Sequence, residues 1–447
     1  MRWIVLRQAV ISCLLAALAM PGVARTRPHY GDTLRVEIAG DPWDRPNGLA
    51  RRLVFEGLTE MGADGNLQPG LAVAWTSENA DHRWQFRLRP GVHFHDGSPV
   101  TSPAIVASLM ASCGSDCPWG AVRALGASLV FTSDAPMPQL PALLAGDAFL
   151  ISKGQAADSD GGSGPFQVSA SANGVLTLIA NETSWQGRPF VDAIEIRSHR
   201  AIGEQWLDLS AGRADVVEVP VEDIRQAQQD HLNLAISDPV EVLALQLGES
   251  GVLSNPNLRS AIAFAIDRNA IANVIFQKQA RASAALLPQN VSGCAFLFPA
   301  ERDLNKAHEL RGGMTPPLLS LEAGGSGAIQ LAAQRIVLNL REAGFNVQLS
   351  APGAKPASMH LRTFRVAGAD PASDLAELVR AAGQADLVMG SDPPAVYHAE
   401  RAFLDRRVLI PVAHLPRAYV TGSRVRDFHL RYDGTPDFER VSLEAGK

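Results

Sequence analysis

The sequence lacks an excess of positive charge. It contains 40 Lys and Arg against 46 Asp and Glu, and its formal net charge is −6. Proteins that bind nucleic acid neutralise phosphates with basic side chains, and this chain has no surplus of them. We therefore expect no nucleic-acid partner.

The sequence also lacks an apolar run long enough to cross a bilayer. Its longest candidate, residues 9–20, follows the positive charges of Arg2 and Arg7 and precedes small residues suited to cleavage. This layout predicts a signal peptide over residues 1–24 and export to the periplasm. Lipidation at Cys13 is a weaker alternative, because that cysteine lies early and more apolar residues follow it.

Motifs of several enzyme classes are absent. The sequence contains no Gly-x-Ser-x-Gly elbow, no His-Glu-x-x-His and no recognisable pair of catalytic carboxylates. The glycine-rich stretch 159–165 is not followed by Gly-Lys-Ser/Thr, so it predicts a turn and not a phosphate loop. We expect no catalytic residues, no cofactor and no metal site; a secreted hydrolase is the weaker alternative.

Cysteine is scarce after the leader, where only Cys113, Cys117 and Cys294 remain. An oxidising compartment would permit a bridge between Cys113 and Cys117, with Cys294 left free. Unpaired thiols are the alternative, and a zinc site lacks a second ligand pair.

The length of 447 residues exceeds what one core supports, so two lobes are expected. Apolar residues that alternate predict strands, and apolar residues with helical spacing predict helices. A helix followed by a glycine and then a strand indicates an α/β layer structure. We predict strands over 32–40, 84–88, 174–181 and 191–198, a short helix within 50–61 that ends at Gly62, and helices over 255–276 and 329–342, the last one followed by a strand.

The stretch His93-Phe94-His95-Asp96 raises the question of a metal site. Asp96-Gly97 has turn chemistry, and Ser98 or Thr101 can cap the apolar-periodic run that follows. We favour a strand-to-helix corner, because no third metal ligand is visible nearby.

Seven stretches, in order, resemble motifs of the family 5 extracellular solute-binding proteins, the peptide and nickel receptors of ATP-binding-cassette importers. They are DTLRVEIAG to LVFEGLTEM, PGLAVAW, the stretch from Phe86 to Leu109, GSGPF, NETSWQGRPFVDAIEIR, LRSAIAFAIDRNAIANVI and AERAFLDRRVLIPVAHLPRAYV.

The resemblance implies an α/β fold of the two-lobed periplasmic binding protein type (type II-like), with mixed sheets, flanking helices and a hinge between the lobes. We expect a first lobe over 25–245 with an inserted subdomain at about 60–180, a shortened second lobe over 246–400, and a return to the first lobe over 401–447.

The implied function is that of a receptor whose cleft closes on a small solute, with a peptide favoured, and delivers it to a membrane permease. The chain is expected to be a monomer. An alternative use of the same fold is a sensor or docking accessory that imports nothing.

The resemblance weakens where family members bind their ligand. The stretch from Phe364 to Asp374 places Asp370 at the acidic position that often holds a peptide's amino terminus, and the expected tryptophan is missing near Arg365. Helix capping by Asp370 is an equal alternative. Six residues are candidates for ligand binding: Asp370, Arg365, Phe364, Trp43, Asp44 and Arg362.

Overall fold

The structure is a computed structural model that describes most of the chain. The described residues are 29–44, 48–62, 64–114, 117–154, 161–294, 298–314, 316–325, 327–351, 357–366, 370–384, 390 and 392–444. The predicted signal peptide and Cys13 lie outside them.

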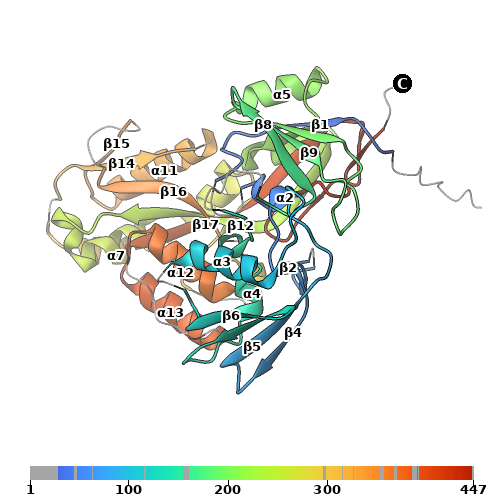
Figure 1. The fold of residues 1–447 in the computed structure, drawn as a ribbon. Helices are drawn as coiled ribbons and strands as arrows, with labels where there is room; N and C mark the ends of the chain where they lie inside the picture. Colours follow the sequence, from blue (N-terminus) through green and yellow to red (C-terminus); the bar gives the residue numbers. More distant parts are fainter. Residues whose placement is uncertain are drawn as a thin grey trace, which may run out of the picture.

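A mixed sheet of 11 strands runs through both ends of the molecule (Figure 1). Its order is β15-β14-β16-β12-β17-β11-β1-β10-β9-β8, and β13 pairs with β17. The bounds are β1 Thr33–Glu37, β8 Phe166–Ala172, β9 Val175–Ala180, β10 Ala193–Arg197, β11 Val216–Val219, β12 Asn233–Leu247, β13 Arg281–Ala282, β14 Leu319–Ala323, β15 Val347–Leu349, β16 Met359–Arg365 and β17 Leu409–Thr421.

Helices cover both faces of this sheet. Their bounds include α2 Arg51–Val54, α5 Ile202–Ser210, α6 Ile224–Gln229, α7 Pro256–Ala265, α10 Leu304–Arg311, α11 Gly327–Glu342, α12 Pro371–Ala381 and α13 Pro393–Asp405. Helix α7 begins after Asn255, whose side chain accepts a hydrogen bond from the amide of Asn257 at 2.9 Å. Asn255 thus caps the helix, which begins where the sequence predicts. The helix ends at Ala265 and not at residue 276, because Ile266 is extended.

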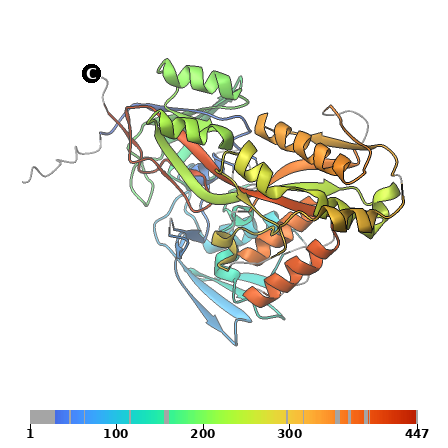
Figure 2. The same cartoon turned by 180° about the vertical axis from the view of Figure 1, so that it is seen from behind.

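Two buried cores lie at opposite ends of the sheet. The first contains β1 residues such as Leu34 and Val36, and the second joins α7 and α11 to β14 and β16. The antiparallel strands β12 and β17 connect these ends, and Figure 2 shows them crossing the width of the molecule from behind. Their pairing is irregular on either side of Pro239. The predicted two-lobed α/β fold is confirmed.

A separate four-stranded sheet lies below the first lobe in Figure 1. It consists of β4 Ala72–Glu78, β5 Arg83–Leu88, β6 Ala121–Leu125 and β7 Ser128–Thr132, with α3 Ser102–Cys113 against it. The side chains of Trp84, Phe86 and Leu88 on β5 are buried, as their alternation predicts.

The His-Phe-His-Asp stretch forms a corner between β5 and α3. Asp96 accepts hydrogen bonds from the amide and hydroxyl of Ser98, and Gly97 has a φ of 81°. Thr101 caps α3 by accepting from the amide of Ala104 at 3.4 Å. The predicted corner is confirmed.

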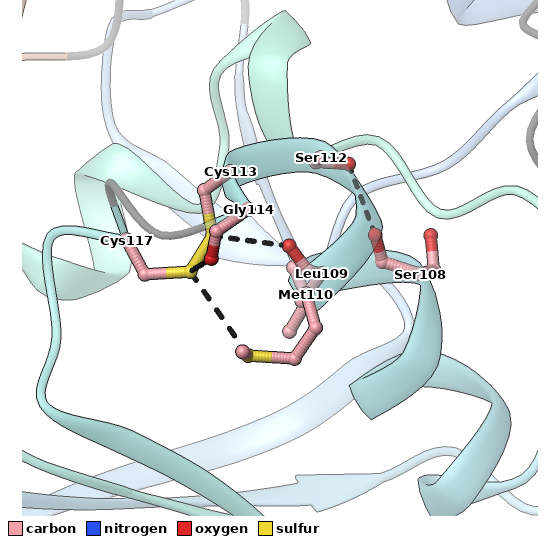
Figure 3. Close-up of a disulfide and its surroundings, with 7 residues drawn as sticks. All are labelled: Ser108, Leu109, Met110, Ser112, Cys113, Gly114 and Cys117. Carbon is pink, nitrogen blue, oxygen red and sulfur yellow. Dashed lines mark hydrogen bonds between the residues drawn. A yellow bond between two sulfur atoms is a disulfide. The ribbon is translucent and has the colours of Figure 1, made fainter.

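Helix α3 ends in a disulfide between Cys113 and Cys117, one of the two states expected for these cysteines (Figure 3). The Cα atoms are 4.9 Å apart, and Cys294 is free and exposed. The bridge closes a short loop just after the helix.

The helix expected to end at Gly62 is much shorter. Helix α2 ends at Val54, and Phe55 is extended. The chain then makes a bridge from Glu56 to Ile151 and enters β2 Thr59–Met61. Pairing with a distant segment overrides the local helical pattern here.

The glycine-rich turn packs directly against the end of α2. A Cβ atom on Gly162 would lie 1.9 Å from the carbonyl oxygen of Val54, and one on Gly164 would lie 2.7 Å from that of Leu53. The glycines are therefore required for close backbone approach and not for phosphate binding.

Candidate ligand cavity

A cavity of about 490 Å³ lies where the two lobes meet on the large sheet. The loop after β1 and strand β11 line it from the first lobe. Strand β16 and helix α12 line it from the second lobe, and the connecting strands β12 and β17 contribute Glu241, Arg417 and Tyr419. Its volume is within the usual range for small-molecule sites.

Four alternating charges cross neighbouring strands beneath the cavity, and we call them the charge row: Glu218 on β11, Arg417 on β17, Glu241 on β12 and Arg365 on β16. Arg417 Nη2 lies 3.0 Å from Glu218 Oε1. The Nε atoms of Arg417 and Arg365 each lie 3.7 Å from Glu241 Oε1. The row links strands of both lobes and is electrically balanced.

Burial strengthens the electrostatics of this row. Burial raises the pKa of Glu241, although Arg417 opposes that shift. Burial lowers the pKa of Arg417, but attraction to Tyr419, Glu218 and Glu241 outweighs it, and the pKa is raised overall. Arg417 therefore stays charged, and removing it would leave two carboxylates without their main partner.

The loop after β1 contributes two carboxylates to the cavity, Asp41 and Asp44. Asp41 accepts a hydrogen bond from the amide of Trp43 at 2.7 Å, and Asp44 accepts from the amide of Asp41 at 3.3 Å. Both side chains are exposed, so the loop presents negative charge to the open space. The structure thus places the candidate Asp44 at the cavity.

Trp43 lies between these carboxylates in sequence but is absent from the cavity lining. It is half-buried, packs against the first-lobe core, and its ring centroid is 6.3 Å from that of Phe55. The turn thus directs the two carboxylates and the tryptophan to different surroundings.

Three further candidates, Arg362, Phe364 and Arg365, line the cavity from β16. The guanidinium of Arg362 lies 5.4 Å from the ring centroid of Phe364, and its Nη1 donates to Gln246 Oε1 at 3.3 Å. Phe364 is buried, so it supplies an apolar wall, while Arg362 is exposed.

Asp370 occupies the N-cap of α12 and is not among the residues that line the cavity. Its Oδ2 atom accepts from the amide of Ser373 at 2.9 Å and from the Ser373 hydroxyl at 2.7 Å. The side chain is 5% exposed. The structure therefore shows the helix-capping alternative, with both hydrogen bonds directed into the first turn of the helix.

Sequence reasoning did not select Glu218, Glu241, Arg417 or Glu377. The first three are charged residues within mostly apolar strands, and a charge in such a strand is the feature of the sequence that could have identified them. Glu377 lines the cavity from α12, where it is exposed, and nothing in its local sequence distinguishes it from an ordinary surface glutamate.

Two further observations concern the described part of the chain. No group of three or more His, Cys, Asp or Glu residues there is arranged to hold a metal ion. No helix in the same residues is both long and apolar enough to cross a membrane.

Comparison with known proteins identifies the family. The family model for bacterial extracellular solute-binding proteins, family 5 Middle, matches residues 66–391. This match covers most of the chain, and the protein belongs to that family.

Curated relatives are distant. The Probable di/tripeptide-binding protein 5 of Pseudomonas aeruginosa is 24% identical over 335 residues, 64% of each chain. The Probable D,D-dipeptide-binding periplasmic protein DdpA of Escherichia coli is 23% identical over 273 residues, 54% of this chain and 52% of the relative. The chain thus spans less than two thirds of the length of these relatives.

Solved structures share the fold over almost the whole chain. The oligopeptide-binding protein AppA of Bacillus subtilis, in complex with a nonapeptide, has a TM-score of 0.78 at 14% identity, covering 94% of this chain and all of that chain. NikA of Staphylococcus aureus, in complex with Ni(L-His)2, has a TM-score of 0.77 at 17% identity, covering 93% of this chain and all of that one.

Proposed function

We propose that the protein is an extracytoplasmic solute-binding receptor that binds a small solute between its lobes and presents it to a membrane permease of an ATP-binding-cassette importer. A peptide is the favoured solute, because two curated relatives are named as dipeptide or di/tripeptide receptors. We further propose a periplasmic monomer without catalytic activity.

The observation that carries this proposal is the cavity itself. It lies at the junction of two lobes whose cores are separate and which β12 and β17 connect. A solute that contacts both walls would favour the closed arrangement by its differential affinity for that arrangement.

The first experiment is a thermal-shift screen of the chain from Arg25 onward against dipeptides and tripeptides. A ligand at 100 times its Kd should add about 2.7 kcal/mol to the stability of the folded state. Ala381→Trp places a large side chain at the cavity and should abolish the shift. Ala211→Trp, at the exposed end of α5, is the matched control and should preserve it.

Small-angle scattering then tests lobe closure. A ligand that raises the melting temperature should also reduce the radius of gyration, in the wild type but not in the Ala381→Trp variant. Stabilisation without compaction would contradict the closure mechanism, and product release from any peptide would contradict a pure receptor.

A sensor is the second candidate function, and one observation favours it. The HTH-type transcriptional regulator SgrR of Escherichia coli is 34% identical to this chain over 84 residues, 19% of this chain and 15% of the regulator. A receptor for import should stimulate ATP hydrolysis by its permease complex when loaded, whereas a sensor should leave that activity unchanged.

A further inference from the structure

The cavity contains more negative charge than its cations neutralise. Five carboxylates line it, on Asp41, Asp44, Glu218, Glu241 and Glu377, against three guanidinium groups on β16 and β17. Two of the carboxylates, Glu218 and Glu241, belong to the charge row described above. The remaining three therefore determine what charge a ligand meets.

Asp41, Asp44 and Glu377 are exposed, and none of them forms an ion pair with another residue of the described part of the chain. Burial raises the pKa of Glu377, and the nearby charge of Arg380 opposes that shift. Asp41 and Asp44 accept backbone amide hydrogen bonds, which leave their charge in place. These three carboxylates are the negative charges of the cavity that lie outside the charge row.

Two of the three cations are neutralised within the charge row. Arg417 and Arg365 pair with the glutamates of the charge row, and Arg362 donates to Gln246 and lies over the ring of Phe364. Gln246 and Phe364 are uncharged, so Arg362 keeps its charge. Outside the charge row, three carboxylates therefore face one guanidinium, and the net charge open to a ligand is negative.

The open carboxylates come from both lobes. Asp41 and Asp44 lie on the first-lobe loop, and Glu377 lies on helix α12 of the second lobe. Closing the lobes brings like charges nearer to each other, which opposes closure unless a positive charge lies between them.

We infer that the preferred solute carries a net positive charge, as an organic ammonium or guanidinium compound, and that Asp41, Asp44 and Glu377 bind its cationic group. This inference rests on the proposed receptor function and adds the charge class of the solute. An organic cation fits better than a bare metal ion, because the described residues offer no metal-binding cluster.

The apolar wall suits the stem of such a solute. Phe364 is buried beneath the open space, and Leu49 and Leu378 line it from the two lobes. A flexible cationic side chain can lay its methylene groups along these residues while its charge reaches the carboxylates.

The test uses three dipeptides that differ in one side chain: Ala-Arg, Ala-citrulline and Ala-Glu. Citrulline has nearly the shape of arginine without its charge. Isothermal titration calorimetry should show Ala-Arg binding about tenfold or more tightly than Ala-citrulline, with Ala-Glu weakest, because a charge-assisted hydrogen bond contributes that much. The advantage of Ala-Arg should shrink as salt is added.

Asp44→Asn and Glu377→Gln should each remove most of the advantage of Ala-Arg over Ala-citrulline. Both side chains are exposed, so the variants should fold. Glu301→Gln, an exposed carboxylate of the second lobe outside the cavity lining, is the matched control and should preserve the advantage.

The outcomes separate the two proposals. Equal or tighter binding of Ala-citrulline or Ala-Glu would overturn the charge inference and support the receptor function. An advantage of Ala-Arg that persists in both cavity variants would overturn the assignment of these carboxylates. If no compound in this set or in the peptide screen binds, the receptor proposal falls, and the charge inference falls with it.

Discussion

Glu56 offers a direct test of how burial controls the pH dependence of stability in this fold. It lies two residues after α2, is 4% exposed, and accepts hydrogen bonds from the Ser163 hydroxyl and the Trp185 indole, both at 2.6 Å. The perturbation is Glu56→Gln, an uncharged side chain of the same shape. Its amide oxygen can accept from the indole, and its NH2 group can donate to the hydroxyl.

The magnitude follows from the pKa of this carboxyl group. Burial raises it from 4.5 to about 8, and repulsion from Glu60 contributes, while the hydrogen bonds from Ser163 and Trp185 oppose the shift. Between these two values the folded state binds the proton and the unfolded state does not, so stability falls as pH rises. Wild type should lose about 4 kcal/mol between pH 4.5 and 8 through this group alone.

The assay is urea unfolding of wild type and Glu56→Gln, followed by circular dichroism at intervals from pH 4.5 to 8. The two proteins should have similar stability at the acidic end, and the variant should become the more stable one towards pH 8. Glu301→Gln, an exposed control, should follow wild type. Parallel curves for wild type and Glu56→Gln would refute the reasoning.

Three further predictions concern packing and charge. Replacing Cys113 and Cys117 by serine should lower the free energy of unfolding by about 2 kcal/mol, and reduction of wild type should have the same effect by calorimetry. Gly162→Ala should lower the free energy of unfolding by about 2 kcal/mol or more, because the added Cβ would clash with the carbonyl oxygen of Val54. Gly203→Ala, whose Cβ would meet no atom within 4 Å, should raise that free energy by up to about 1 kcal/mol, because alanine favours a helix more than glycine does. Thermal unfolding of both variants measures these changes. Arg417→Met should cost about 3–5 kcal/mol in urea unfolding by leaving the charge row incomplete, and an unchanged midpoint would contradict the role given to that row.

Local patterns were sufficient to predict several elements of the fold. The start of α7 after Asn255, the end of α11 at Glu342 and the alternation along β5 each depend on neighbours within a few residues. The length of α2 could not be predicted in this way, because the bridge from Glu56 to Ile151 joins segments far apart in the sequence.

The candidate site was only partly predictable for the same reason. Asp44 and the candidates on β16 line the cavity, but the charge row exists only once four strands lie in register. The family resemblance implies that Asp370 binds a ligand. In the structure its carboxylate instead accepts a hydrogen bond from the amide of Ser373 and caps helix α12. Ligand specificity in such a fold depends on side chains that converge from distant segments.

The end of the chain has a consequence for the order in which the protein can be made. Phe438, Val441 and Leu443 pack in the same core as Leu34 and Val36 at its beginning. About 400 residues, including the whole second lobe, are synthesised between these two groups. The first lobe therefore cannot complete this core until Phe438, Val441 and Leu443 have been made, so its interior stays open while the whole second lobe is synthesised.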